Sequence, residues 1–145
     1  MPVKAKDATS RTPSFNKFLN DVRRAEVGVI AKLEKEFGQL LIRHVEISKS
    51  GISFDAFLPG GTKSTFAEVK LVSRPVISPN TLDGVLYRAL LADATLNRHF
   101  KLILVVVYSF AKTDLPQMES LWRQKVERCP AEIELRFMPL DELDT

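Results

Sequence analysis

Residues 54–70 read FDAFLPGGTKSTFAEVK and predict a β-hairpin, around which the rest of the chain can be arranged. Apolar and polar residues alternate over about 52–58 and 65–72, and Pro59-Gly60-Gly61 between them is typical of a turn. Successive side chains point to opposite faces of a strand, so charged residues two positions apart share a face. The expected faces are Ile52, Phe54 and Ala56 against Asp55 and Phe57, and then Ala67, Val69 and Leu71 against Phe66, Glu68 and Lys70.

The segments outside the hairpin predict three helices and three further strands. Apolar residues recur at steps of three and four over about 15–37, which is typical of an amphipathic helix. The continuous β-branched run at 101–109 is typical of a central strand covered on both faces. The other elements are expected at about 40–48 (strand), 82–96 (helix), 115–128 (helix) and 132–140 (strand). This α-β-β-β-α-β-α-β order predicts an α/β fold, of the α+β type, with a mixed sheet flanked by helices.

Length and composition indicate one globular domain. The chain has 145 residues, of which 45% are hydrophobic and 27% are charged. We expect residues 1–13 to form a flexible basic arm and residues 14–145 to form a single domain. The net charge of +3 and the pI of about 9.1 permit an anionic partner without requiring one.

The sequence indicates no secretory signal, membrane span or disulfide. The first residues lack an apolar core, and the longest apolar run, 102–108, is too short to span a bilayer. Cys129 is the only cysteine, so we expect a small buried side chain rather than a bridge or a nucleophile. We therefore expect a soluble protein of the cytoplasm.

Two common catalytic patterns do not fit. The run GGTKST at residues 60–65 lacks the Gly-Lys-Ser/Thr order of a phosphate loop and lies between two strands, so a solvated turn is the better interpretation. His44 and His99 have no histidine or cysteine at metal-ligand spacing. We expect both to be ordinary surface or half-buried histidines.

The charged face of the hairpin admits two interpretations. Taken alone, Glu68 and Lys70 indicate a solvated strand face with a surface ion pair, and such a pair stabilises a protein by about 0–1 kcal/mol. With Asp55 on the antiparallel partner strand, they instead form an oxygen-rich site suited to Mg²⁺, with an ammonium group beside it. That combination is suited to metal-assisted phosphodiester hydrolysis, in which the lysine holds a water or neutralises developing charge.

A third carboxylate lies in the first predicted helix. Glu26 falls on the apolar stripe, four residues after Val22 and three before Val29, where an unpaired charge is unfavourable. The helix could break at Gly28, or Arg23 could pair with Glu26. Otherwise Glu26 points toward a cation that it shares with the hairpin carboxylates.

Asp55 is followed by Glu68-Val69-Lys70, and a helix that carries Glu26 precedes both in the sequence. This combination resembles the PD-(D/E)XK nuclease superfamily, which has the restriction-endonuclease-like fold. The resemblance spans about residues 15–110 and implies an αβββαβ core with a mixed central sheet. It implies that Asp55, Glu68, Val69 and Glu26 form the metal site. It also implies that Glu26, Asp55, Glu68 and Lys70 are the catalytic residues, with Lys70 supporting the nucleophilic water.

The chain departs from the pattern of that superfamily at two places. Phe54, rather than proline, precedes Asp55, a substitution that the superfamily tolerates widely. The helix that follows the hairpin lacks a glutamine often found there. Asp83, Tyr87 or Arg88 could take over its role, or no residue does.

The resemblance implies a function as well as a fold. We expect a Mg²⁺-dependent endonuclease or exonuclease that hydrolyses phosphodiester bonds in DNA, with Mn²⁺ able to replace Mg²⁺. A homodimer or a partner subunit would help a small nuclease to choose sites. The alternative is a catalytically inactive nucleic-acid-binding or assembly subunit with the same fold. The residues expected to contact phosphates are Arg23, Arg24, Lys63 and Arg74.

Overall fold

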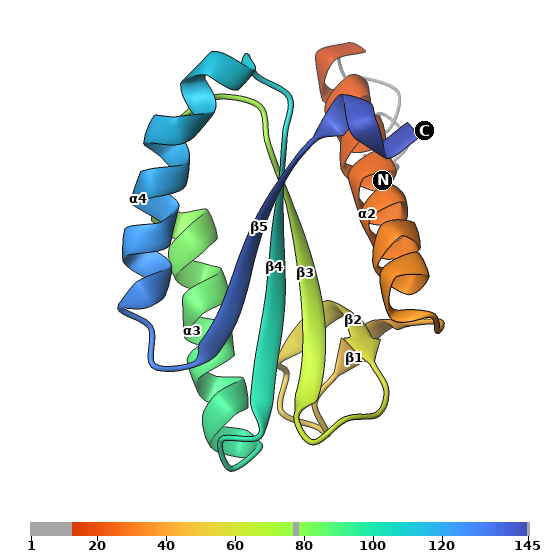
Figure 1. Cartoon of the computed structure of the whole chain (residues 1–145), viewed down its shortest axis with the longest axis vertical. Coiled ribbons are helices and arrows are strands. Elements are labelled where there is room, and N and C mark those ends of the chain that lie inside the picture. The colour runs from red at the N-terminus through yellow and green to blue at the C-terminus, as the bar shows by residue number, and fades with distance from the viewer. Residues whose placement is uncertain (1–12, 77–78, 145) are drawn as a thin grey trace, which may run out of the picture.

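The computed structural model describes residues 13–76 and 79–144 and has the predicted order of helices and strands (Figure 1). Two short 3-10 helices in the last third of the chain, η1 and η2, are additional to the predicted elements. The expected basic arm lies outside the described residues, except for Pro13, which is the first residue of α2. The elements are α2 (Pro13–Phe37), β1 (Ile42–Glu46), β2 (Ser53–Leu58), β3 (Ser64–Val72), α3 (Pro79–Thr95), β4 (Phe100–Tyr108), η1 (Lys112–Asp114), α4 (Leu115–Glu127), β5 (Glu132–Pro139) and η2 (Leu140–Asp144).

The strands form one five-stranded mixed sheet in the order β1-β2-β3-β4-β5. β1 and β2, and β2 and β3, pair antiparallel, whereas β3 and β4, and β4 and β5, pair parallel. Figure 1 shows α3 and α4 on one face of the sheet and α2 on the other. This arrangement confirms the α/β class and the mixed sheet with helices on its faces. β3 is the strand at which antiparallel pairing changes to parallel pairing.

Each face of the sheet has its own apolar core. Alternate residues of β4 enter the two cores, which explains why this strand reads as a continuous apolar run. The core on the side of α3 and α4 includes Phe54, Phe66, Leu82, Val85, Leu102, Leu104, Met118 and Trp122. The core on the side of α2 includes Ala25, Val29, Leu33, Ala56, Ala67, Val69, Ile103 and Val105.

α2 runs without a break through Gly28, so the first explanation of the half-buried Glu26 does not hold. A Cβ at Gly28 would lie 2.7 Å from Leu143 Cβ in η2, so glycine is needed for the close approach of these elements. The helix ends at Phe37, and the φ of 69° at the following Gly38 is typical of the residue that terminates a helix. None of the helices within the described ranges is long and apolar enough to cross a membrane.

Candidate functional site

The predicted hairpin opens at Asp55, where β2 separates from β3. The pairing of β2 with β3 runs from Leu58 to Ala56, whereas β3 continues beside β4 as far as Val72. The separation leaves backbone N–H groups without a strand partner, and two carboxylates accept their hydrogen bonds. The N–H of Asp55 donates to Glu68 Oε1 at 3.1 Å, and the N–H of Val69 donates to Asp55 Oδ2 at 2.8 Å. Each carboxylate therefore stabilises the opposite strand of the opened hairpin.

The regular alternation predicted for β2 is wrong at this point, although it is correct in β3. Phe54 and Phe57, three positions apart, both contact the ring of Phe66, with centroid distances of 5.2 and 5.0 Å. Phe54 and Ala56, predicted to share a face, belong to the two different cores. The chain rotates at Asp55 because the ladder to β3 ends there. On β1, His44 lies between Arg43 and Val45, which pair with Ala56 and Phe54 on either side of Asp55, and it has a φ of 53°.

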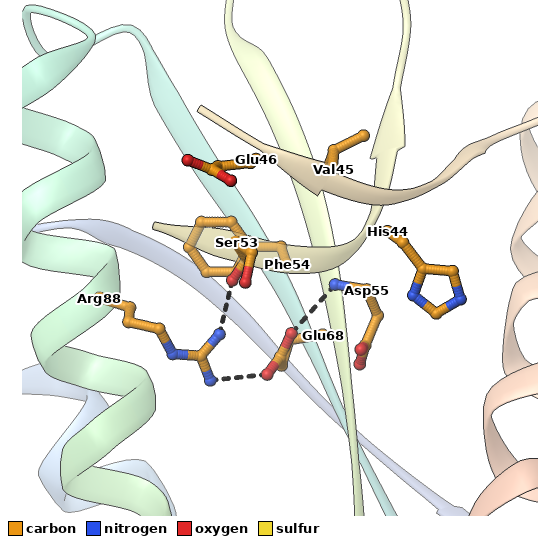
Figure 2. A pocket seen from close by; sticks show the side chains of 8 residues that line it. All are labelled: His44, Val45, Glu46, Ser53, Phe54, Asp55, Glu68 and Arg88. Carbon is orange, nitrogen blue, oxygen red and sulfur yellow. Dashed lines mark hydrogen bonds and ion pairs between the residues drawn. The ribbon is translucent and has the colours of Figure 1, made fainter. Parts of the chain in front are cut away.

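Glu68 is almost fully buried, with 4% of its surface exposed, and is surrounded by positive charge. Arg88 Nη2 lies 2.6 Å from Glu68 Oε2, and Lys70 Nζ lies 3.3 Å from the same oxygen. The Arg88 guanidinium also donates to the carbonyl oxygen of Ser53 at 2.7 Å and lies 5.4 Å from the centroid of the Phe54 ring. Figure 2 shows Arg88 reaching from α3 across the cavity to Ser53 and Glu68. A buried carboxylate with this many partners is not the solvated surface pair of the simpler interpretation.

Arg88 is one of the three residues considered in place of the missing glutamine, and it is the one that reaches the site. The carboxylate of Asp83 instead pairs with Lys125 at 3.1 Å, and Tyr87 is exposed. The sequence contains an indication of this role. Arg88 lies three residues after Val85 and four before Ala92, on the buried stripe of α3, so it is a charge in an apolar pattern, as Glu26 is in α2.

The surroundings of Asp55 destabilise its negative charge. Burial raises the pKa of Asp55 to about 6, and the negative charges of Glu68 and Glu26 add to this effect. The hydrogen bond from the N–H of Val69 and the positive charge of Lys70 oppose it without cancelling it. An additional cation beside Asp55 would relieve this imbalance, which makes the carboxylate pair a suitable cation site.

Glu26 and Asp55 line a common cavity of about 290 Å³ between α2 and the sheet, together with Phe18, Val22 and Lys70. Asp55 also lines a second cavity, of about 280 Å³, with His44, Glu68 and Arg88 (Figure 2). Asp55 therefore lines both cavities. Within the described ranges, no three carboxylate, histidine or cysteine side chains come together in a way that could hold a metal ion. A direct role for Glu26 beside the other two carboxylates stays a prediction.

The four residues expected to contact phosphates do not form one surface group. Arg23 and Arg74 are exposed. Arg24 lies 3.7 Å from Asp21 and 3.9 Å from Asp141, and Lys63 forms an ion pair with Glu132. Arg24 and Lys63 therefore already have acidic partners in the protein, and their contact with a nucleic acid stays a prediction.

No protein-family model, curated protein or solved structure matches this chain. The observations that bear on its function are therefore the five-stranded mixed sheet and the cluster of Asp55, Glu68, Lys70 and Arg88 at the opening between β2 and β3.

Proposed function

We propose that this protein is a Mg²⁺-dependent nuclease of the PD-(D/E)XK type, with a restriction-endonuclease-like core, and that it hydrolyses phosphodiester bonds in DNA. One observation carries the proposal: Asp55, Glu68 and Lys70 meet where β2 separates from β3, beside an open cavity. The three residues are spread over 16 positions of the sequence and come from two strands. The element order and the mixed sheet fit the same superfamily.

The donor set fits a hard divalent cation. Mg²⁺ in proteins usually takes one or two carboxylates and keeps several waters, with substrate phosphates completing its coordination. Asp55 and Glu68 supply two carboxylates, and the raised pKa of Asp55 indicates that its negative charge lacks a sufficient counterion. When bound, Mg²⁺ would supply Lewis-acid stabilisation of the phosphate and of the attacking water.

The protein's own residues have separate roles in this proposal. Lys70 is half-buried and lines the cavity of Asp55 and Glu26, so its ammonium group is suited to holding the attacking water. It is also suited to stabilising the charge that develops on the phosphate oxygens. In the reaction the water oxygen loses a proton to solvent and forms a bond to phosphorus, while the ester bond from phosphorus to the leaving oxygen breaks and that oxygen takes up a proton from solvent. Glu26 adds negative charge on the α2 side of Asp55 and favours retention of the cation.

A second candidate function is that of a nucleic-acid-binding or assembly subunit that does not catalyse. The Glu68 carboxylate favours this alternative, because both of its oxygens already have protein partners. A buried ion-pair network of this kind can be retained for structural specificity alone. In that case Asp55 would only close the opened hairpin through its bond to the N–H of Val69.

Cleavage assays separate the two functions. The purified protein would be incubated with linear, branched and single-stranded DNA and RNA, with and without Mg²⁺, and Asp55→Asn prepared in the same way would control for contaminating nucleases. We expect Mg²⁺-dependent cleavage of DNA by the wild type only, Mn²⁺ as a replacement, and no turnover with Ca²⁺. Binding of DNA without cleavage in any divalent ion would contradict the nuclease and support the binding subunit.

A further inference from the structure

Arg88 lies directly against the carboxylate of Glu68, one of the two proposed cation ligands. Its guanidinium makes a contact of 2.6 Å with Glu68 Oε2 and a hydrogen bond of 2.7 Å with the carbonyl oxygen of Ser53. Its position over the Phe54 ring adds a third contact. Arg88 is thus held on three sides, as a fixed group rather than as a mobile surface side chain.

Both carboxylate oxygens of Glu68 are engaged. Oε1 accepts the hydrogen bond from the N–H of Asp55, and Oε2 faces Arg88 at 2.6 Å and Lys70 at 3.3 Å. A carboxylate this deeply buried is costly unless it is paired with positive charge, and Arg88 makes the shorter of its two ionic contacts. In the conformation described here, Arg88 is therefore the main counterion of Glu68.

We infer that Arg88 competes with the divalent cation for Glu68, as a built-in counterion that must release this carboxylate before a cation can bridge it to Asp55. The inference rests on the proposed function in one respect, namely that these two carboxylates bind a divalent cation. The reason is electrostatic. A guanidinium within hydrogen-bond distance of a cation ligand repels the cation and holds the oxygen that the cation would use. Release leaves Arg88 in the cavity that it lines with Asp55 and Glu68.

A purely structural role for Arg88 predicts a different result. If Arg88 only tied α3 to β2 and oriented Glu68, its loss would loosen the site and weaken cation binding. If Arg88 competes with the cation, its loss removes a repelling charge and frees an oxygen, so cation binding becomes tighter. The direction of the change in affinity therefore distinguishes the two roles.

The test is the affinity of purified Arg88→Gln for Mn²⁺ and for Mg²⁺, measured by titration calorimetry in the absence of nucleic acid. We expect a dissociation constant at least about fivefold lower than that of the wild type, because one unit charge within about 5 Å of the cation is removed. Arg98→Gln is the matched control. It removes the same charge from a guanidinium 3.0 Å from another buried carboxylate, Asp93, which lies near the C-terminal end of α3 and lines neither cavity of the site. We expect its affinity to stay within about twofold of the wild type.

An unchanged or weaker affinity of Arg88→Gln would overturn the inference while leaving the proposed function intact, provided that the wild type binds the cations. Failure of the wild type and of Arg88→Gln to bind either cation would overturn both.

A measurement on the wild type covers the case in which Arg88→Gln does not fold. In ¹⁵N NMR spectra, the Arg88 guanidinium signal, assigned with Arg88→Lys, should show slow hydrogen exchange without cation. Saturating Mg²⁺ should make this exchange faster by about tenfold or more. A guanidinium signal that stays protected when Mg²⁺ is bound would overturn the inference.

Discussion

Two clusters of charged residues in this protein use the same groups but differ in how well their charges are balanced. In the surface cluster of Arg136, Glu36 and Glu134, the Arg136 guanidinium makes two hydrogen bonds to Glu36, at 2.7 and 2.9 Å, and a third to Glu134 at 2.6 Å. The hydrogen bond from Arg136 lowers the pKa of Glu36. Burial raises the pKa of Glu134, but hydrogen bonds from Lys101 and Arg136 outweigh it, and the net shift is downward.

In the cluster at the opening of the hairpin, the carboxylate pKa shift has the opposite direction. Arg88 and Lys70 both lie beside Glu68, whereas Asp55 has a pKa raised to about 6 by burial and by the neighbouring carboxylates. The surface cluster thus stabilises every charge that it contains, and the hairpin cluster leaves one destabilised. Destabilised ionisable groups in a cavity are typical of functional sites, since a structural ion-pair network gains nothing from them. The predictions below test this difference.

The largest expected effect is on catalysis. Asp55→Asn and Glu68→Gln should each lower Mg²⁺-dependent cleavage of DNA below detection, because each substitution keeps the size of the side chain and removes a charge that binds the cation. Initial rates of cleavage measure the effect, and circular dichroism checks that each variant is folded. DNA binding should persist in Asp55→Asn.

The control for these two variants comes from the surface cluster. Glu134→Gln removes a carboxylate that is also bound to an arginine and lies on another strand of the same sheet. Its cleavage rate should stay within about twofold of the wild type, because Glu134 lines neither cavity of the hairpin cluster and solvent and salt screen the effect of its charge there. A comparable loss of activity in Glu134→Gln would mean that the difference between the clusters has no functional meaning.

A smaller effect on catalysis is expected for Lys70. Lys70→Ala should lower kcat about 10²–10³-fold at saturating Mg²⁺, because the ammonium group acts on charge that develops in the transition state. Single-turnover cleavage at saturating Mg²⁺ measures this effect. Lys101→Ala is the matched control, since Lys101 is a half-buried lysine on the adjacent strand that pairs with Glu134 at 3.0 Å. Full activity of Lys70→Ala would remove Lys70 from the catalytic residues.

The sequence predicts the order of elements well because each element has its own local pattern. β4 reads as a buried strand, and α2 reads as an amphipathic helix up to its glycine cap. The rotation of β2 at Asp55 could not be predicted in this way, because it depends on where the ladder to β3 ends. A carboxylate that accepts a hydrogen bond from the opposite strand leaves no trace in hydrophobic periodicity.

The candidate site also divides into residues that the sequence indicates and contacts that only the folded structure shows. Asp55, Glu68 and Lys70 could be singled out because they lie on predicted strand faces, and Glu26 because it interrupts an apolar stripe. The contact of Arg88 with Glu68 joins residues 20 positions apart on different elements, so it requires the packing of α3 against the sheet. Charges on apolar stripes are the feature of the sequence that indicates such contacts in advance.

The next prediction concerns stability without divalent cations. The folded-state pKa of Asp55, about 6, lies above its ordinary value of 3.8. A raised pKa means that the folded protein holds a proton more tightly than the unfolded chain, so stability is lost as the pH rises from about 4 through about 6. Asp55→Asn should avoid this loss. It should be more stable than the wild type by about 1–3 kcal/mol at pH 8 and by little or nothing at pH 4.

Urea unfolding of both proteins at the two pH values, in the presence of a chelator, measures this difference. Glu36→Gln serves as the reference, since the pKa of Glu36 is shifted in the opposite direction. An Asp55→Asn variant that is less stable than the wild type at pH 8 would show that the charge of Asp55 stabilises the fold. The contrast between the two clusters would then be wrong.

The smallest expected effect is in the surface cluster itself. Glu36→Gln should lower the free energy of unfolding by no more than about 1 kcal/mol at low salt, because the Glu36 side chain is about half exposed to solvent. The lowered pKa of Glu36 means that this contribution is present near neutral pH and is lost as the pH falls through the folded-state pKa. Urea unfolding at pH 7 in about 0.05 and 1 M NaCl measures the cost, which should shrink at high salt as screening increases. A loss of several kcal/mol in the free energy of unfolding that does not depend on salt would show that this cluster behaves as a buried structural ion-pair network. The well-paired charges of Glu36, Glu134 and Arg136 could then no longer serve as the surface reference for the destabilised charge of Asp55.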